Sequence, residues 1–280
     1  MSKSDANFTI APLLRRIYAL AAVVVIAGAG LYFLPGLLVP IWPWPLAPFN
    51  TRFLGTIYTV ELIALAITVV VNQWAPTRLV LWISSVFVVL VTLVSFFYLD
   101  RFDSQKLTTW LWFVLYTGSA AGLVYYLWYY RNRPPADPRP IPPRWRTYLF
   151  AEAAVYGLYG LGLLAAPALF GSFWPWKIDS FHAQIYSAIF LALATGSLVL
   201  SRAAAPIEFL TMGVSQLAFG VLAILGLILV DASVRRVNWS SPGTWLWVAG
   251  LLVLALAGAA MIRRASLLGH TISESSVLTT

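Results

Sequence analysis

The sequence predicts an all-α integral membrane protein with eight transmembrane helices, arranged as two parallel four-helix repeats. Three observations lead to this fold class. AVILMFWYC residues make up 60% of the 280-residue chain and charged residues only 10%, against about 25% charged in an average soluble domain. Long uncharged apolar runs recur from end to end, and a set of motifs occurs twice at a nearly constant offset. A soluble enzyme, a disulfide-rich secreted domain and a disordered chain are therefore excluded.

Eight apolar segments are each about 20 residues long, which lets a helix cross a hydrocarbon core of roughly 30 Å. Strands of a membrane barrel need only about 9–11 residues, so runs of this length favour helices. The predicted spans are 14–39, 53–72, 78–99, 109–130, 147–170, 184–202, 206–230 and 244–262. The predicted units are a first four-helix membrane unit (1–130), a Pro-rich cytoplasmic linker (131–145), a second four-helix membrane unit (146–264) and a disordered C-terminal tail (265–280).

A tandem duplication is indicated by comparing the chain with itself. An offset of 132 positions gives 14 identities over the 44 positions 14–57, without a gap. The identities include both Trp-Pro-Trp motifs, at 42–44 and 174–176, and smaller shifts pair Thr-Trp-Leu-Trp at 109–112 with 244–247. Because each unit has an even number of spans, the second enters the membrane in the same sense as the first, and the repeat is predicted to be parallel.

The orientation follows from the positive charges. With the N-terminus inside, twelve of the eighteen Lys and Arg residues fall on the inner segments, which favours both termini in the cytoplasm. Six prolines among residues 131–144 favour an extended linker between the units. Arg outnumbers Lys fifteen to three, a bias associated with prokaryotes of high GC content, so the inner (plasma) membrane of a prokaryote is expected. The basic residues flank apolar segments, and no nucleic-acid partner is predicted.

Tryptophans gather where the predicted spans meet the outer face. Two interpretations remain open: interfacial anchors that set the depth of the helices, or a surface that binds a quinone, a pigment or a lipid. The same cluster could cap a partner subunit. The outer aromatic cluster consists of Trp42, Trp44, Trp110, Trp112, Trp174, Trp176, Trp245 and Trp247.

Glu61 is the first candidate for a ligand or ion site, with Tyr58 and Gln216 as further candidates. It lies about nine residues into the second predicted span, roughly 13 Å deep at 1.5 Å per residue. An ionised carboxylate at that depth is costly, so Glu61 is protonated, paired with a cation, or faces a wet cavity. The alternative is a neutral acid that hydrogen-bonds to a neighbouring helix. Its counterpart in the second unit is Leu193.

The remaining polar residues are interpreted as structural. Glu152 and Glu208 are expected in the first turns of the fifth and seventh spans, at the inner interface, where acids suit the helix dipole. His182 is interpreted as a solvated loop residue, since one imidazole makes a poor metal site. No metal site is predicted, and the chain has no cysteine.

Small residues at helical spacing predict close helix packing, chiefly within the chain and otherwise between chains. The predicted helix-packing residues are Gly28, Gly30, Gly118, Gly122, Gly160 and Gly162. Each half also resembles the DoxX-like four-helix bacterial membrane proteins, on Gly28, Gly30, Pro35 and Gly55 in the first unit and Gly160, Gly162 and Pro167 in the second. Ser187 stands where Gly55 would recur. The resemblance implies a four-helix unit and a role facing quinones, without placing catalytic residues.

The sequence shows no nucleophile, metal or cofactor-binding motif, so no catalytic residue is predicted and a non-enzymatic protein is expected. The first hypothesis is an accessory or structural subunit of a membrane complex, which contacts other membrane subunits or itself, or holds an apolar ligand or lipid. The second is a small-solute or proton-linked transporter or channel with Glu61 in its cavity. The third is a quinone-interacting redox subunit. A cavity that reaches Glu61 would favour transport, and a dry bundle the structural role.

Overall fold

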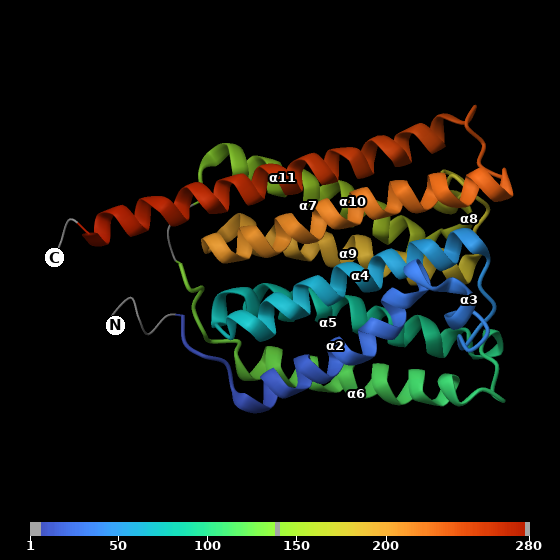
Figure 1. Cartoon of the computed structure of the whole chain (residues 1–280), viewed down its shortest axis with the longest axis horizontal. Coiled ribbons are helices and arrows are strands. Elements are labelled where there is room, and N and C mark those ends of the chain that lie inside the picture. Colours follow the sequence, from blue (N-terminus) through green and yellow to red (C-terminus); the bar gives the residue numbers. More distant parts are fainter. Residues whose placement is uncertain (1–6, 138–140, 278–280) are drawn as a thin grey trace.

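The protein is a bundle of long helices lying roughly side by side (Figure 1). The computed structural model of the chain describes residues 7–137 and 141–277, with side chains as far as residue 267. Within these residues no strand occurs, and eight helices are long and apolar enough to cross a membrane, which confirms the predicted fold class. The fold therefore defines a polytopic α-helical membrane protein.

Prolines set where most of the helices begin. Pro at the first helical position costs no hydrogen bond there, and its fixed φ suits the helix. Pro35 and Pro167 also end α2 and α7, each of which continues after one non-helical residue as a short helix. The helices are α2 (Pro12–Phe33), α3 (Pro35–Leu38), α4 (Pro48–Val71), α5 (Trp74–Phe97), a 3-10 turn η1 (Leu99–Arg101), α6 (Leu107–Tyr129), α7 (Pro143–Ala165), α8 (Pro167–Gly171), α9 (Ser180–Arg202), α10 (Pro206–Val234) and α11 (Pro242–Val277).

Each predicted span overlaps one of the eight long helices, with most ends within about six residues of the prediction. The spans 14–39 and 147–170 each include a break, because α2 ends at Phe33 and α7 at Ala165 and the short helices α3 and α8 follow.

Two C-terminal ends extend beyond the prediction. α10 is longer than predicted and runs to Val234, after which Arg235 adopts a left-handed conformation that ends the helix. α11 continues to Val277, whereas residues 265–280 were expected to be a disordered tail. No proline interrupts the chain after residue 242, so nothing in the backbone stops the helix at residue 264. Residues 278–280 lie outside the described part, as do 138–140 of the predicted linker.

The start of the first helix and the end of the last helix lie at the same end of the bundle, which we call the terminal end. α2 begins there and α11 ends there, whereas α3 and α8 lie at the opposite end, the tryptophan end (Figure 1). The two Trp-Pro-Trp motifs follow α3 and α8 directly, so both lie at the tryptophan end. This is the arrangement that a parallel duplication requires, although the repeat itself stays a prediction.

The two halves of the chain interlock rather than lying as separate bundles. α2 packs on α4, and α7 packs on α9. α5, however, packs more on α9 of the second half than on α4 of its own, and α10 likewise packs more on α4 than on α9. The interface between the halves is therefore formed by four helices, α4, α5, α9 and α10.

Glycine allows some of these helices to approach closely. A Cβ on Gly28 of α2 would lie 2.3 Å from the ring of Tyr58 on α4, and one on Gly160 of α7 would lie 2.8 Å from Leu191 on α9. Gly30 and Gly162 make room for side chains of the short helices α3 and α8. In contrast, a Cβ at Gly118 or Gly122 of α6 would have no described atom within 4 Å, so these two glycines face open space rather than another helix of the chain.

A buried ion pair joins the halves near the terminal end. Arg78 of α5 lies 2.8 Å from the carboxylate of Glu208 in the first turn of α10, and it also donates to the carbonyl oxygen of Ala203 at 2.7 Å. The other carboxylate oxygen of Glu208 accepts the backbone N–H of Ala205 at 2.7 Å. The side chain of Glu208 is fully buried and that of Arg78 is 12% exposed. Glu208 lies in the first turn of α10, as predicted, but its cationic partner comes from the other half of the chain.

Removing one partner of this pair is expected to destabilise the protein more than removing both. Glu208→Gln leaves the Arg78 guanidinium buried without a counter-ion, which typically costs about 3–5 kcal/mol. The double variant Arg78→Met/Glu208→Leu buries no charge and should recover most of that loss. Unfolding in mixed detergent micelles, followed by tryptophan fluorescence, measures both. Equal losses in the single and double variants would contradict this account of the pair.

Candidate functional site

A small cavity lies in the interface between the two halves. It has a volume of about 50 Å³ and is walled by α4, α5, α9 and α10. Most of its lining is aliphatic or aromatic, and its polar members are Glu61, Ser84, Thr211 and Ser215. A space of this size can hold a few water molecules, because one water needs only about 10–15 Å³ on this measure. Pockets for drug-sized ligands are larger, about 300–1,000 Å³.

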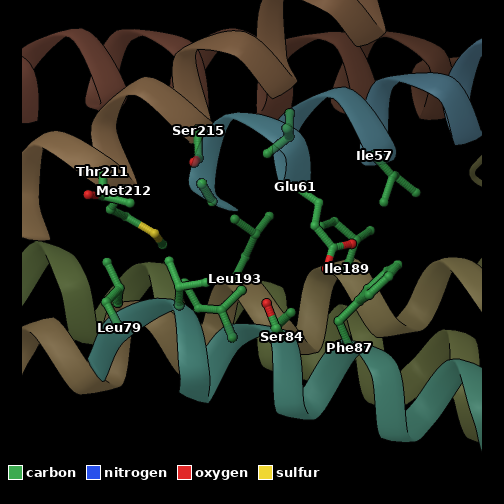
Figure 2. A pocket seen from close by; sticks show the side chains of 15 residues that line it. Ile57, Glu61, Leu79, Ser84, Phe87, Ile189, Leu193, Thr211, Met212 and Ser215 are labelled. Atoms are coloured by element: carbon green, nitrogen blue, oxygen red, sulfur yellow. The ribbon is translucent and has the colours of Figure 1, made fainter. Parts of the chain in front are cut away.

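Glu61 is the acid of this cavity. In Figure 2 its carboxyl group points from α4 toward α5, between Ile189 and Phe87. Glu61 is thirteen residues after the start of α4 and ten before its end, so it lies about 20 Å from one end of the helix and 15 Å from the other at 1.5 Å per residue. It forms no hydrogen bond or ion pair with any residue that the structure describes. Ser215, on the facing helix α10, likewise has a buried hydroxyl without a partner.

Tyrosine hydroxyls lie close to Glu61 on the side of α2 and α6. Tyr58, one turn before Glu61 on α4, shares a 2.8 Å hydrogen bond with Tyr116 of α6. Tyr18 of α2 is buried, and its hydroxyl has no partner. All three tyrosines lie within electrostatic range of Glu61. The structure thus brings Glu61 and Tyr58 together, as two of the three ligand candidates that the sequence suggested.

The third candidate, Gln216, belongs to a different cluster. Its side-chain amide donates to Glu152 of α7 at 3.0 Å, and Glu152 also accepts the hydroxyls of Tyr148 at 2.8 Å and Ser197 at 2.6 Å. Glu152 is buried nine residues into α7, about 13 Å from its start, and not in the first turn as predicted. The prediction failed because α7 begins at Pro143, four residues before the predicted start of the span. Sequence reasoning therefore missed this cluster, whose members come from α7, α9 and α10.

The tryptophans of the outer aromatic cluster divide into two kinds. Trp110 and Trp245 are 60% and 56% exposed, whereas the other six are buried. The buried rings meet edge to face, for example Trp44 with Trp112 at 4.8 Å and Trp176 with Trp247 at 5.6 Å between centroids. Contacts also cross between the halves, and the indole N–H of Trp176 donates to Asn50 at 2.8 Å. Six of the eight tryptophans therefore form a packed aromatic layer that closes the tryptophan end of the interface, rather than a surface of anchors.

His182 is a buried helix residue and not a solvated loop residue as expected. It lies in the first turn of α9, where Asp179 caps the helix by accepting the backbone N–H of His182 at 2.9 Å. The imidazole Nδ1 lies 2.7 Å from the same carboxylate oxygen, and Arg101 of η1 pairs with the other oxygen. Partial burial alone raises the pKa of Asp179, but the hydrogen bonds from His182 and the charge of Arg101 outweigh that effect and lower the pKa to about 2.

The chain matches no protein-family model, and comparison with curated proteins and with solved structures found no match. The resemblance of each half to DoxX-like proteins therefore stays a prediction. Among the described residues no group of three or more His, Asp or Glu side chains could hold a metal ion. What distinguishes this polytopic membrane protein is an unpaired acid in a cavity between its two halves.

The pKa of Asp179 predicts how this contact depends on pH. A carboxyl whose pKa is lower in the folded protein than in the unfolded chain stabilises the fold above the unfolded value, near 4, and the stabilisation disappears as the pH falls through 2. Because the side chain is 42% exposed, solvent screening limits the effect to about 1 kcal/mol. Asp179→Asn, which keeps a helix-capping side chain, should be less stable than the wild type at pH 7 in detergent unfolding, and this difference should shrink from pH 4 downward and vanish below pH 2. A constant difference over this range would show that the charge is not responsible.

Proposed function

We propose that this protein is a proton-linked membrane transport protein in which Glu61 takes up and releases the proton. The observation that supports the proposal most directly is the unpaired carboxyl of Glu61, far from both ends of α4 and facing a cavity. A carboxyl without a counter-ion in apolar surroundings is stable as the neutral acid or when hydrated. A group that changes between these two forms is what a proton-carrying site requires.

The position of the cavity favours a role of Glu61 in transport over a purely structural role. Its walls come from both halves, so a shift of one half against the other would change the access to Glu61 from either face of the membrane. In this structure the aromatic layer closes the interface toward the tryptophan end, and the Arg78–Glu208 pair crosses it near the terminal end. Contacts between the halves therefore lie toward both ends of the bundle, with the cavity between them.

Tyrosines within electrostatic range of Glu61 lie toward both ends of the bundle. The Tyr58–Tyr116 pair lies nearer the tryptophan end, and Tyr18 lies six residues after the start of α2, nearer the terminal end. A hydroxyl can accept one proton while it donates its own, so it can relay a proton without a net change. The corresponding positions of the predicted second unit carry Phe150, Phe190, Leu193 and Leu251, which cannot do so. The proton path is therefore proposed for the first half alone.

Two of the earlier hypotheses find less support in this cavity. A volume of about 50 Å³ is several times too small for a quinone or a lipid, so neither is proposed as its ligand. The accessory-subunit hypothesis retains one specific observation in its favour. Gly118 and Gly122 form a small-xxx-small pair on α6 that no described helix of the chain covers, and such pairs commonly mark contacts between membrane helices.

Proton transfer can be tested in vesicles that contain the purified protein and the pH indicator pyranine. A potassium gradient with valinomycin supplies the driving potential, and the internal pH is recorded. Glu61→Gln keeps the size of the side chain but cannot release a proton, so the protein-dependent flux should fall at least about tenfold. Flux equal to that of the wild type in this variant would overturn the proposal.

Leu193 provides a matched control, because it lines the same cavity from α9 at the position that the predicted repeat aligns with Glu61. The double variant Glu61→Leu/Leu193→Glu moves the acid across the cavity and should restore a substantial part of the flux. Loss of flux in the double variant, in a protein that unfolds like the wild type, would show that an acid in the cavity is not sufficient.

The accessory-subunit hypothesis has a simple test because the chain contains no cysteine. Gly118→Cys should form a disulfide-linked dimer in native membranes if α6 contacts a second copy, or a higher-mass adduct with a cysteine-reactive cross-linker if it contacts another subunit. The exposed residue Val253 of α11 gives a control, and Val253→Cys should cross-link much less. Equal cross-linking of the two variants would indicate random collision.

A further inference from the structure

A second, larger hollow lies on the outside of the bundle between α7 and α11. The two helices are joined by a hydrogen bond from Tyr156 to the carbonyl oxygen of Gly250 at 3.3 Å, in the half of the bundle nearer the tryptophan end. Toward the terminal end they leave an open groove of about 530 Å³. Its walls are Trp145 and Tyr148 from α7 and Val253, Leu256, Ala257 and Ala260 from α11.

Two arginines lie near the terminal end of this groove, Arg144 in its lining and Arg264 one helical turn after Ala260. Arg144, the second residue of α7, lines the groove itself. Arg264 lies close enough to Arg144 for their charges to repel, and its guanidinium packs over the rings of Trp145 and Phe209 at 5.9 and 5.2 Å. The Nε of Arg264 is buried without a hydrogen-bond partner. Two neighbouring positive charges repel each other, and an anion bound between them would relieve that repulsion.

We propose that this groove binds one anionic phospholipid, with its phosphate between Arg144 and Arg264 and an acyl chain along α11. Guanidinium groups bind phosphate oxygens through paired hydrogen bonds, which would give the free Nε of Arg264 its partner. Basic pockets between membrane helices on the cytoplasmic side are a known way to bind anionic headgroups. The predicted orientation places the terminal end, and hence both arginines, on that side.

The length of the groove suits an acyl chain better than a free anion. Eleven residues separate Val253 from Arg264 on α11, a rise of about 16 Å at 1.5 Å per residue. This nearly equals one leaflet, which is about half of a 30 Å hydrocarbon core. Below the arginines the groove offers apolar walls and the hydroxyl of Tyr148, which already donates to Glu152. Inorganic phosphate would use the arginines but leave these walls without a ligand.

Native mass spectrometry of the full chain in a mild detergent tests the site. The protein is titrated with palmitoyl-oleoyl phosphatidylglycerol or with the zwitterionic phosphatidylcholine of the same chains. One phosphatidylglycerol should be retained about tenfold more tightly than phosphatidylcholine. Arg144→Ala and Arg264→Gln should each weaken that retention about fivefold, the effect of one basic residue near an anionic headgroup.

Two controls distinguish lipid binding in the groove from unspecific attraction of the lipid to basic residues on the surface. Arg146 lies at the same end of α7 but packs over Phe150 and does not line the groove, so Arg146→Ala should leave the retention unchanged. Ala260→Trp should fill the groove and weaken the retention while both arginines remain. Because Ala260 is exposed, the substitution need not disturb the core.

Several outcomes would overturn the proposal. Equal retention of the two lipids, or an equal loss in Arg146→Ala and Arg144→Ala, would point to unspecific attraction. Unchanged retention in Ala260→Trp would place the lipid elsewhere. Displacement of the lipid by millimolar inorganic phosphate, with the same dependence on Arg144, would make a free anion the ligand of the arginines. Thermal unfolding of each variant identifies any that fail to fold, and Arg264→Lys then replaces Arg264→Gln.

Discussion

The interlocking of the halves is the constraint on which the remaining features depend. Because α5 packs on α9 and α10 packs on α4, neither half can bury its own interface alone. The shift that aligns Ala75-Pro76 with Ala205-Pro206 also aligns Arg78 with Glu208, so the ion pair joins two corresponding positions. At the tryptophan end Trp44 contacts Phe181 and Trp176 contacts Phe49, again as corresponding pairs. Contacts near each end hold the interface, and the cavity remains between them.

Three acids within the helices, Glu152 and Glu208 buried and Glu61 partly exposed, show three ways of placing a carboxyl in a low-dielectric interior. Glu208 has a counter-ion, and Glu152 accepts three side-chain hydrogen bonds, so both are compensated in the way that burial demands. Glu61 has neither, although it lies deepest along its helix. The Glu61 carboxyl, which has neither a counter-ion nor a hydrogen bond, lowers the stability of the fold, whereas the compensated carboxyls of Glu152 and Glu208 do not. Polar groups that reduce stability in this way are typical of functional positions. This contrast, more than depth alone, separates Glu61 from the structural acids.

The sequence predicts what depends on local chemistry and misses what depends on distant partners. The eight spans follow from the length of the apolar runs and from the prolines, both of which act within a few residues. The position of Glu61 within a helix, far from its ends, could be predicted for the same reason, although α4 begins five residues before the predicted span and places Glu61 about 20 Å rather than 13 Å from its start. Tyr148 is one helical turn from Glu152, but the other partners of Glu152, Ser197 and Gln216, lie on other helices, and no spacing rule reveals them. The pairing of Arg78 with Glu208 spans 130 positions and is hidden for the same reason. The burial of six tryptophans was missed because an indole at a helix end suits both a lipid interface and a packed layer.

The two proposed sites lie where the halves of the predicted repeat differ in sequence. Tyr18 of α2, Tyr58 of α4 and Tyr116 of α6 lie within electrostatic range of Glu61. The corresponding positions of the second half carry Phe150, Phe190 and Leu251, and there the groove between α7 and α11 is open toward the terminal end. Arg144 and Arg264 correspond to Pro12 and Tyr129, so the first half lacks the pair of charges that the groove carries. If both halves descend from one unit, each has kept the shared helix packing. The first half then differs in the residues beside α2 and α6, and the second in those between α7 and α11. A proton site in one and a lipid site in the other would then be separate specialisations of the same frame.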